Sequence, residues 1–335
     1  MTAPLVFDGT ILGRGRITGV GRSFLNALAA YAPHAGRSCV LLLPARAEDP
    51  RIEGVHVVHA ELGGLSRQLV LPQLLHRLGA ALLHAPMAAI PLRAPCPVIA
   101  TLHDLPWLHV LPKGEPGRGV RHRLVARLAL RRAARVLVPS LATRADIERW
   151  AGPRAAARVV VVPHTTPLPA SAADPGRLTG PFLVLGDDRP RKNLERVVAA
   201  HARAQTQDPT LPALQIAGPR RGYLNEAEKT LALRQARAVL HLSLLEGFGL
   251  PVLEAMAHGV PVVCSDIGAL RELADDAALL VDPTDRDAMA SALLRIHRDA
   301  ELRTRLATAG RARAAAYAPA RTVEAWQQVH GELLR

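Results

Sequence analysis

The chain has 335 residues, a length typical of about two domains. Apolar residues make up 49% and charged residues 21%, a composition that excludes a disordered protein. Only 3% of the residues are aromatic, which argues against a protein that stacks many nucleic-acid bases. The cysteines Cys39, Cys96 and Cys264 are far apart and form no CxxC pair. This pattern excludes a disulfide scaffold and a cysteine-based zinc module, and it favours a reducing compartment.

The formal net charge is +13, and the excess of positive charge lies almost entirely in the first half of the chain. Residues 1–170 hold 21 Lys+Arg and 9 Asp+Glu, a net of +12, whereas the remainder holds 21 and 20, a net of +1. The charge is densest in residues 113–135, where Arg123, Arg127 and Arg131 share one stripe of a predicted helix. Three interpretations stay open: a solvated helix face, an anionic membrane surface and, least favoured, a nucleic acid.

Short apolar runs that are typical of strands alternate with helical periodicity along the first half of the chain. Strands are predicted at residues 4–7, 38–43, 55–58, 80–84, 98–102, 136–138 and 159–162, and helices at 21–31, 66–78, 118–134 and 143–150. Residues 163–181 are rich in Pro, Ser, Thr and Gly without periodicity, and we predict that they form a linker.

After the linker the same pattern restarts. Strands are predicted at residues 182–185, 213–217, 238–242, 260–264 and 278–281, and helices at 193–205, 224–235, 251–258, 285–297, 300–316 and 321–334. This alternation indicates an α/β protein with two Rossmann-like domains that face each other across a cleft. The expected domains are residues 1–165 and 166–318, with residues 319–335 forming a helix that packs back on the first domain. Ligands are expected at the carboxyl ends of the strands.

Neither an export signal nor a membrane-spanning helix is expected. No basic head followed by an apolar run opens the sequence, and prolines and Arg93 interrupt the least charged stretch, residues 80–102. The expected location is the cytoplasm, with the protein either free or bound peripherally to the inner face of the plasma membrane.

The most informative segment is residues 246–263, with the sequence EGFGLPVLEAMAHGVPVV. Its glycines allow close approach of the backbone to a ligand, and Pro251 suits the first position of a helix that Leu250 would cap. The N-terminus of such a helix attracts an anion such as a diphosphate. Glu246 precedes the turn and Glu254 is expected in the first helical turn, so both carboxylates can accept hydrogen bonds from one ligand's hydroxyl groups.

Lys192 is one of only three lysines in an arginine-rich chain, and with Arg191 it precedes a predicted helix. Cations at that end oppose the helix dipole, so a bound phosphate would explain them, the alternative being a solvated helix start. The DxD triplet Asp285–Arg286–Asp287 also opens a predicted helix, where acids cap the N-terminus, so we expect no metal ion.

The segment EGFGLPVLEAMAHGVPVV resembles the E-x7-E signature of glycosyltransferase family 4, retaining enzymes of the GT-B fold. The resemblance extends to SDIGALRE at 265–272, AALLVDP at 277–283 and LVLGDDRPRKNL at 183–194, and more loosely to GVGR at 19–22, TLHDL at 101–105 and VPS at 138–140. Two departures stand out. Asp187 occupies a position that often holds Arg, and the segment from Gly218 to Gln235 is shorter than the strand and helix that the family usually has there.

The resemblance implies a role for each matching residue. Glu246 would contact the hydroxyls of the donor sugar, and His103 would lie beside the reacting sugar, so these two are the expected catalytic residues. Glu254 would bind the ribose, and Lys192 with Arg191 would neutralise the diphosphate. The backbone would contact the sugar or the phosphates at Gly19, Gly21, Gly247, Phe248, Gly249 and Leu250.

The implied function is transfer of a sugar from a nucleotide-sugar donor, GDP-mannose before UDP- or dTDP-sugars, to a glycan or lipid-linked acceptor in polysaccharide or glycolipid biosynthesis. The nucleotide sugar is a co-substrate, and no cofactor, metal or nucleic acid is expected. Arg123, Arg127 and Arg131 would face the acceptor or an anionic membrane. The alternatives are a non-catalytic partner in a polysaccharide assembly complex, a nucleotide-sugar epimerase and, disfavoured by the scarcity of lysine, a phosphorylase.

Overall fold

The computed structural model describes residues 2–13, 18–64, 66–114, 119–171, 173, 179–218, 222 and 224–335. The chain divides into two compact units. We call the first the N-terminal unit, which comprises Met1–Leu105, Arg118–Thr165 and Pro319–Arg335, and the second the C-terminal unit, which comprises Pro106–Gly117 and Thr166–Ala318. Each unit is described by itself.

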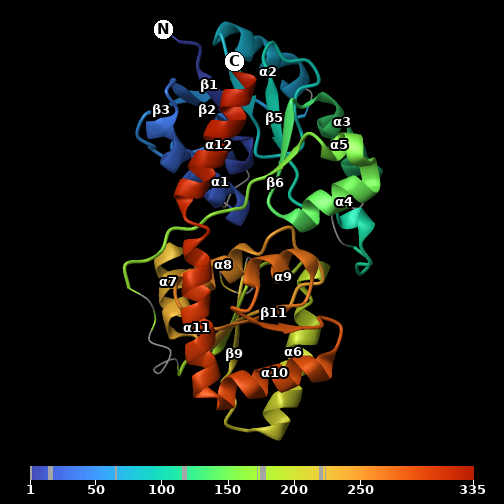
Figure 1. Ribbon diagram of the computed structural model, residues 1–335, viewed down its shortest axis with the longest axis vertical. Coiled ribbons are helices and arrows are strands. Elements are labelled where there is room, and N and C mark those ends of the chain that lie inside the picture. The colour runs from blue at the N-terminus through green and yellow to red at the C-terminus, as the bar shows by residue number, and fades with distance from the viewer. Residues whose placement is uncertain are drawn as a thin grey trace. The chain divides into compact units, whose positions relative to one another are not determined.

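The N-terminal unit contains a seven-stranded parallel sheet in the order β3-β2-β1-β4-β5-β6-β7 (Figure 1). Its strands are β1 (Leu5–Asp8), β2 (Cys39–Leu43), β3 (Val55–His59), β4 (Leu82–His84), β5 (Val98–Thr101), β6 (Arg135–Val138) and β7 (Val159–Val161). All seven predicted strands are confirmed. Every residue of β1 and β2 is buried, as expected for apolar runs in a parallel sheet covered on both faces.

Five helices of this unit lie between or after the strands. They are α1 (Gly19–Tyr31), α2 (Ser66–Arg77), α3 (Val120–Arg132), α4 (Leu141–Ala151) and α5 (Pro153–Ala156). The four longer ones match predicted helices. The sequence prediction missed α5, because a helix of four residues is too short to show a 3.6-residue period.

The last helix of the chain, α12 (Pro319–Leu333), belongs to the core of the N-terminal unit. Trp326 is 4% exposed and stacks on Phe7 of β1, with ring centroids 5.8 Å apart. His330 lies within hydrogen-bond distance of two groups, with Nδ1 2.7 Å from Tyr31 Oη and Nε2 3.1 Å from His84 Nδ1. Aromatic packing and this buried chain of hydrogen bonds therefore attach α12 to α1 and β4.

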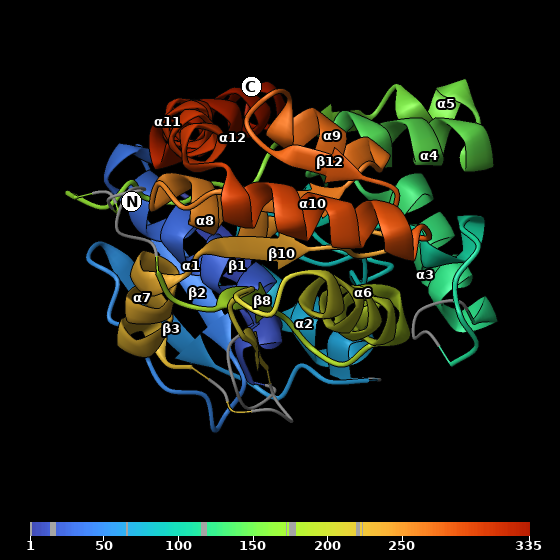
Figure 2. The same ribbon diagram turned by 90° about the horizontal axis from the view of Figure 1, so that it is seen from below.

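The C-terminal unit contains a five-stranded parallel sheet in the order β12-β11-β10-β8-β9. Its strands are β8 (Phe182–Leu185), β9 (Leu214–Ala217), β10 (Ala238–His241), β11 (Val262–Ser265) and β12 (Leu279–Val281), and its helices are α6 (Leu194–Gln207), α7 (Glu226–Gln235), α8 (Leu250–Ala257), α9 (Gly268–Ala274), α10 (Arg286–Arg298) and α11 (Ala300–Ala315). The helices α6 and α10 lie side by side on one face of the sheet (Figure 2). The five strands and all the helices except α9 match predictions.

The short helix α9 was missed because it begins with Gly268 and no side chain caps its first turn.

Each sheet has one point at which the order of its strands reverses. That point falls between β1 and β4 in the N-terminal unit and between β8 and β10 in the C-terminal unit. Open α/β sheets bind ligands beyond the carboxyl ends of the strands at such switch points, so these two places are where a site is sought.

Candidate functional site

The switch point of the C-terminal unit brings Lys192 and Glu246 together. Lys192 ends a 3-10 turn (Pro190–Lys192) that follows β8, and Glu246 follows β10. Lys192 Nζ donates to Glu246 Oε1 over 2.6 Å, and the two side chains are 12% and 10% exposed. His241, the last residue of β10, lies with Nε2 3.0 Å from the same carboxylate oxygen. The two residues that the sequence assigned to the sugar and the diphosphate are therefore direct neighbours.

Asn193 holds the turn that carries Lys192. Its backbone is left-handed, with φ of 60°, a conformation that asparagine tolerates better than most residues. Its buried Nδ2 donates to the carbonyl oxygens of Leu242, at 3.0 Å, and Pro283, at 2.7 Å. The turn is thereby attached to the segments that follow β10 and β12. Lys192 precedes helix α6, which begins at Leu194, and the Glu246 carboxylate compensates its charge.

The charges around Glu246 keep its carboxylate ionised. Burial by itself would raise the pKa of Glu246, but the Lys192 ammonium and then His241 outweigh burial and hold the pKa well below its ordinary value. Burial lowers the pKa of His241 although Glu246 opposes that shift. At neutral pH His241 is therefore a neutral imidazole whose Nε2–H donates to Glu246. The result is a carboxylate in one fixed orientation that can accept further hydrogen bonds.

Helix α8 starts one residue earlier than predicted. Gly249, with φ of +109°, occupies the cap position, so Leu250 is the first helical residue and Pro251 the second. A Cβ on Gly249 would overlap the Cδ2 methyl group of Leu270, which leaves no room for another residue. Glu254 is consequently the fifth residue of α8 and not part of its first turn, contrary to the prediction. Pro251 has no N–H, and the N–H groups of Val252 and Leu253 donate to the carbonyl oxygen of Gly249, so the N–H of Leu250 is the group of this turn that remains for a ligand.

Two neighbours in this segment have different environments. The Phe248 side chain is 6% exposed and packs edge-on against Tyr317, with centroids 5.7 Å apart, so this side chain belongs to the apolar core. Gly247 immediately follows Glu246 and precedes Phe248 in the loop between β10 and α8. The donor-binding expectation for residues 247–250 therefore concerns the backbone alone.

The second carboxylate, Glu254, is paired with a lysine that the sequence analysis did not assign to the site. Lys229 of α7 donates from Nζ to Glu254 Oε1 over 2.7 Å, and the two side chains are 15% and 20% exposed. Asn225 and Glu228 form a capping box at the start of α7, which fixes the helix end that carries Lys229. The scarcity of lysine was the sequence signal that could have identified it.

Both departures from the family pattern have structural counterparts. Asp187 forms an ion pair with Arg189, with Arg189 Nη2 2.6 Å from Asp187 Oδ2. Burial opposes ionisation of Asp187, but Arg189 and then Lys192 outweigh it and lower its pKa. Asp187, which stands where the family often has Arg, is thus paired with Arg189. The side chain of Arg191 is buried, at 7% exposure. In the part of the chain that the structure describes, α7 is the one regular element between β9 and β10.

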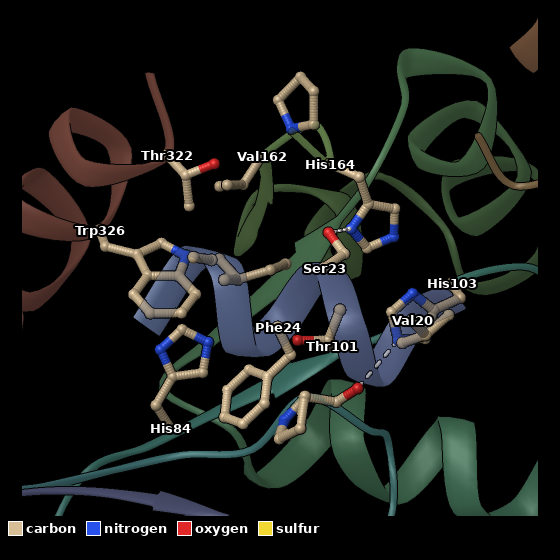
Figure 3. A pocket seen from close by; sticks show the side chains of 14 residues that line it. Val20, Ser23, Phe24, His84, Thr101, His103, Val162, His164, Thr322 and Trp326 are labelled. Atoms are coloured by element: carbon tan, nitrogen blue, oxygen red, sulfur yellow. Dashed lines mark hydrogen bonds between the residues drawn. The ribbon is translucent and has the colours of Figure 1, made fainter. Parts of the chain in front are cut away.

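The switch point of the N-terminal unit carries a pocket with a volume of about 50 Å³ (Figure 3). It lies at the carboxyl ends of β4 and β5, which end at His84 and Thr101. Its lining combines aromatic rings, hydroxyl groups and imidazoles, and comprises Val20, Ser23, Phe24, Ala27, His84, Pro86, Thr101, His103, Leu137, Val162, Pro163, His164, Thr322 and Trp326. The lining therefore offers both apolar surface and hydrogen-bonding groups.

His103 lines this pocket, at the end of β5 as predicted from its position. Its Nε2–H donates to the carbonyl oxygen of Pro86 over 2.9 Å. Its Nδ1 is buried and has no hydrogen-bond partner among the residues that the structure describes. Burial lowers the pKa of His103, against smaller opposing effects of Pro86 and Asp104. A neutral His103 therefore offers a free lone pair on Nδ1, which can accept a hydrogen bond from a hydroxyl group of a ligand.

The sequence analysis missed the other polar groups of the pocket. His164 stacks on His103, with ring centroids 5.4 Å apart, and its Nδ1 lies 3.0 Å from Ser23 Oγ of α1 (Figure 3). Burial and then His103 lower the pKa of His164 to about 3. Trp326 and Thr322 arrive from α12, more than 200 residues further along the chain than His103. No local pattern connects these residues, because only the sheet topology brings them together.

Gly19 and Gly21 lie inside the first turn of α1, which begins two residues earlier than the helix predicted at residues 21–31. The helix begins at Gly19 because Thr18 caps it, and Gly21 N–H donates to Thr18 Oγ1 over 3.2 Å. Gly21 N–H is therefore already bonded, whereas the N–H of Gly19 lies at the helix N-terminus, where intrahelical acceptors are lacking.

The predicted cationic stripe lies on the surface of α3. Arg123, Arg127 and Arg131 are all exposed, and the Arg127 guanidinium stacks over the Trp150 ring at 5.2 Å from its centroid. Leu124, beside them, is 55% exposed.

Within the described residues, each helix is too short or too polar to span a bilayer, and no group of three or more His, Cys, Asp or Glu side chains is placed to hold a metal ion.

The comparisons with known proteins agree with this geometry. Residues 17–168 match a family model described as Glycosyltransferase Family 4, and residues 220–313 match one described as Glycosyl transferases group 1. The chain is 44% identical over 78 residues to O-antigen chain mannosyltransferase B of Escherichia coli, a match that covers 23% of this chain and 20% of that protein. It is 31% identical over 237 residues to phosphatidyl-myo-inositol mannosyltransferase of Mycolicibacterium smegmatis, covering 62% of this chain and 58% of that protein.

The matched regions thus span less than two thirds of the length of these curated relatives. The fold is similar over almost the whole chain to that of sucrose-phosphate synthase from Thermosynechococcus elongatus, with a TM-score of 0.79, 20% identity and 99% coverage of both chains. At that identity the likeness concerns the fold, which is GT-B. The two family models, which fall on both units and together match more than half of the chain, show that the chain belongs to family 4 of the glycosyltransferases.

Proposed function

We propose that this protein is a retaining glycosyltransferase that moves a sugar from a nucleotide-sugar donor to a glycan or lipid-linked acceptor. The observation that carries the proposal is the Lys192–Glu246 pair at the switch point of the C-terminal unit. It places a cation for a diphosphate beside an ionised acceptor for sugar hydroxyls, next to the N-terminus of α8. The family supports the reaction type, and the geometry supports the assignment of roles.

On the donor side, Lys192 and the first turn of α8 would stabilise the negative charge that develops on the departing diphosphate. Glu246, held by His241, would accept hydrogen bonds from the donor sugar, and Glu254 from the ribose. On the acceptor side, the free Nδ1 of His103 would accept a hydrogen bond from a hydroxyl group beside the reacting carbon. The sugar would be delivered from the face that the diphosphate leaves, without a metal ion.

GDP-mannose is the proposed donor, with UDP- and dTDP-sugars next, because the curated relatives from E. coli and M. smegmatis described above are named as mannosyltransferases. A lipid-linked acceptor at an anionic membrane surface is supported by the exposed arginines of α3 and by the net charge of +12 in residues 1–170, which holds 21 Lys+Arg and 9 Asp+Glu. The relative from M. smegmatis is named for a lipid acceptor. Biosynthesis of a polysaccharide or glycolipid at the inner face of the plasma membrane is the corresponding role.

A screen of donor hydrolysis and transfer tests the proposal, with GDP-mannose, UDP-glucose, UDP-N-acetylglucosamine and dTDP-rhamnose as donors. We expect turnover of one donor, and loss of at least 100-fold in the folded variants Glu246→Gln and Lys192→Met. Conversion of a nucleotide sugar without hydrolysis or transfer would indicate an epimerase. Absence of binding to every donor in calorimetry would favour the non-catalytic partner of an assembly complex.

A further inference from the structure

Lysine is used selectively in this chain, which has three lysines among 42 Lys+Arg residues. Two of the three, Lys192 and Lys229, each donate to one carboxylate of the Glu246 and Glu254 pair, at 2.6 and 2.7 Å. An ammonium is a compact charge with three donors, whereas a guanidinium is a rigid planar fork that a carboxylate engages from the side. Because an ammonium can donate to several acceptors at once, the use of lysine at both carboxylates indicates that each ammonium also donates to an acceptor on a ligand.

The surroundings of Lys229 leave part of its hydrogen-bonding capacity unused. Its ammonium donates to Glu254 Oε1 at 2.7 Å and forms an ion pair with Glu226 Oε2, one turn earlier in α7, at 3.3 Å. These two contacts engage at most two of the three N–H donors. Among the residues that the structure describes, neither the third N–H nor Glu254 Oε2 has a hydrogen-bond partner. The pair is partly exposed, at 15% and 20%, so a ligand can reach both groups.

Lys229 is the fourth residue of α7, a helix that follows β9 closely in the sequence. Leu233 of α7 is buried in the same apolar cluster as Leu253 of α8. The contact between Lys229 and Glu254 joins the two helices at their polar surface. The third N–H of the ammonium and the second oxygen of Glu254 consequently form an adjacent donor and acceptor.

We propose that Lys229 is a ligand-binding residue that completes a ribose site together with Glu254. This inference rests on the proposed function, in which Glu254 meets the ribose of the donor. The two hydroxyl groups of a ribose present one proton to an acceptor and one oxygen to a donor side by side, which matches Glu254 Oε2 and Lys229 Nζ. Lys229 also compensates the charge of Glu254, which would otherwise repel the diphosphate of the same ligand.

Calorimetry with GDP and UDP, and with the 2′,3′-dideoxy form of whichever binds, tests the inference. Removal of the two hydroxyls should weaken binding to the wild type by about tenfold or more, because it leaves a carboxylate oxygen and an N–H unpaired. In Lys229→Met the affinities for the ribonucleotide and for its dideoxy form should differ by less than about threefold, because the variant binds the ribonucleotide more weakly and the dideoxy form as before. Lys229→Arg should keep part of the difference, since a cation still contacts Glu254.

The double variant Lys229→Met/Glu254→Gln should bind the ribonucleotide no more weakly than Glu254→Gln alone if the two residues act as one unit. Arg234→Met removes an exposed cation from the same helix and should bind both nucleotides as the wild type does. Thermal melting checks that the variants are folded. An equal loss of affinity for both nucleotides in Lys229→Met overturns the ribose assignment, whereas a wild type that binds none of GDP, UDP and dTDP overturns the proposed function itself.

Discussion

The Lys192 ammonium and the Glu246 carboxylate lie 2.6 Å apart although 54 residues separate them in the chain. The contact arises because β8 and β10 are neighbours in the sheet while the intervening β9 lies at its edge. Loops after two neighbouring parallel strands emerge at the same edge, so their side chains converge there. Both side chains are largely buried, and the ammonium of Lys192 lowers the pKa of Glu246 and so keeps its carboxylate ionised.

Lys192→Met should destabilise the C-terminal unit more than the double variant Lys192→Met/Glu246→Gln does. Removing one partner of a buried ion pair leaves an uncompensated charge and costs about 3–5 kcal/mol, whereas removing both charges costs less. Urea unfolding followed by circular dichroism measures the difference. A double variant less stable than Lys192→Met would show that Glu246 does not depend on Lys192 for its charge.

His103→Phe should lower the rate of sugar transfer by about 100-fold while leaving donor binding within about threefold, because the free Nδ1 is lost and the ring stacking on His164 is kept. His76→Asn, which removes an exposed histidine of α2, serves as the control and should be fully active. Steady-state kinetics separate kcat from KM. Unchanged kcat in His103→Phe would remove His103 from the reacting centre.

Gly249→Ala should destabilise the protein by about 2–4 kcal/mol, since its φ of +109° is unfavourable for alanine and the added methyl group would meet Leu270. Gly331→Ala is the matched control. Gly331 lies in α12 with open space around its Cβ position, and alanine there should stabilise the helix by about 0.5–1 kcal/mol. Equal melting temperatures for the two variants would contradict the assignment of Gly249 as the cap of α8.

Acid should destabilise the N-terminal unit through the buried pair His84 and His330. Burial lowers the pKa of His330 to about 4, and burial and then His330 hold the pKa of His84 well below its ordinary value of 6.5. Both rings are neutral when folded, and the unfolded chain binds protons more readily. The stabilisation is therefore complete above pH 6.5 and is lost as the pH falls towards 4, by about 3 kcal/mol for His330.

His330→Gln keeps a hydrogen-bonding side chain without a titrating group, so its unfolding midpoint in urea should change less between pH 7.5 and pH 5 than that of the wild type. His76→Asn should retain the wild-type dependence. An unaltered pH dependence in His330→Gln would mean that other groups cause the acid sensitivity.

The triple variant Arg123→Gln/Arg127→Gln/Arg131→Gln should lose binding to vesicles that contain phosphatidylglycerol. Each cation near an anionic surface contributes about 1 kcal/mol, so three correspond to roughly 100-fold in affinity at low salt. Replacing the exposed Arg286, Arg295 and Arg305 of the C-terminal unit by Gln is the control. Unchanged co-sedimentation of the triple variant with the vesicles would show that the arginine stripe of α3 does not bind the membrane.

Much of the architecture could be predicted from local patterns. Apolar runs of four or five residues located every strand, because parallel strands are buried on both faces and need no distant information. Among the α-helices that the structure describes, α5 and α9 were not predicted, because both are short and lack a capping side chain. The exact start of α8 was also missed, because the sequence does not show that Gly249 has a positive φ.

The sequence by itself therefore determined the two parallel α/β units, the uneven charge and the residues whose types suit a diphosphate and a sugar. The tertiary structure decided which of them meet: Lys192 with Glu246, Lys229 with Glu254, and His103 with His164. Strand order and helix packing set these contacts across 25 to 61 residues of chain. A local pattern encodes the conformation of a segment, but it carries no information on which distant segment folds beside it.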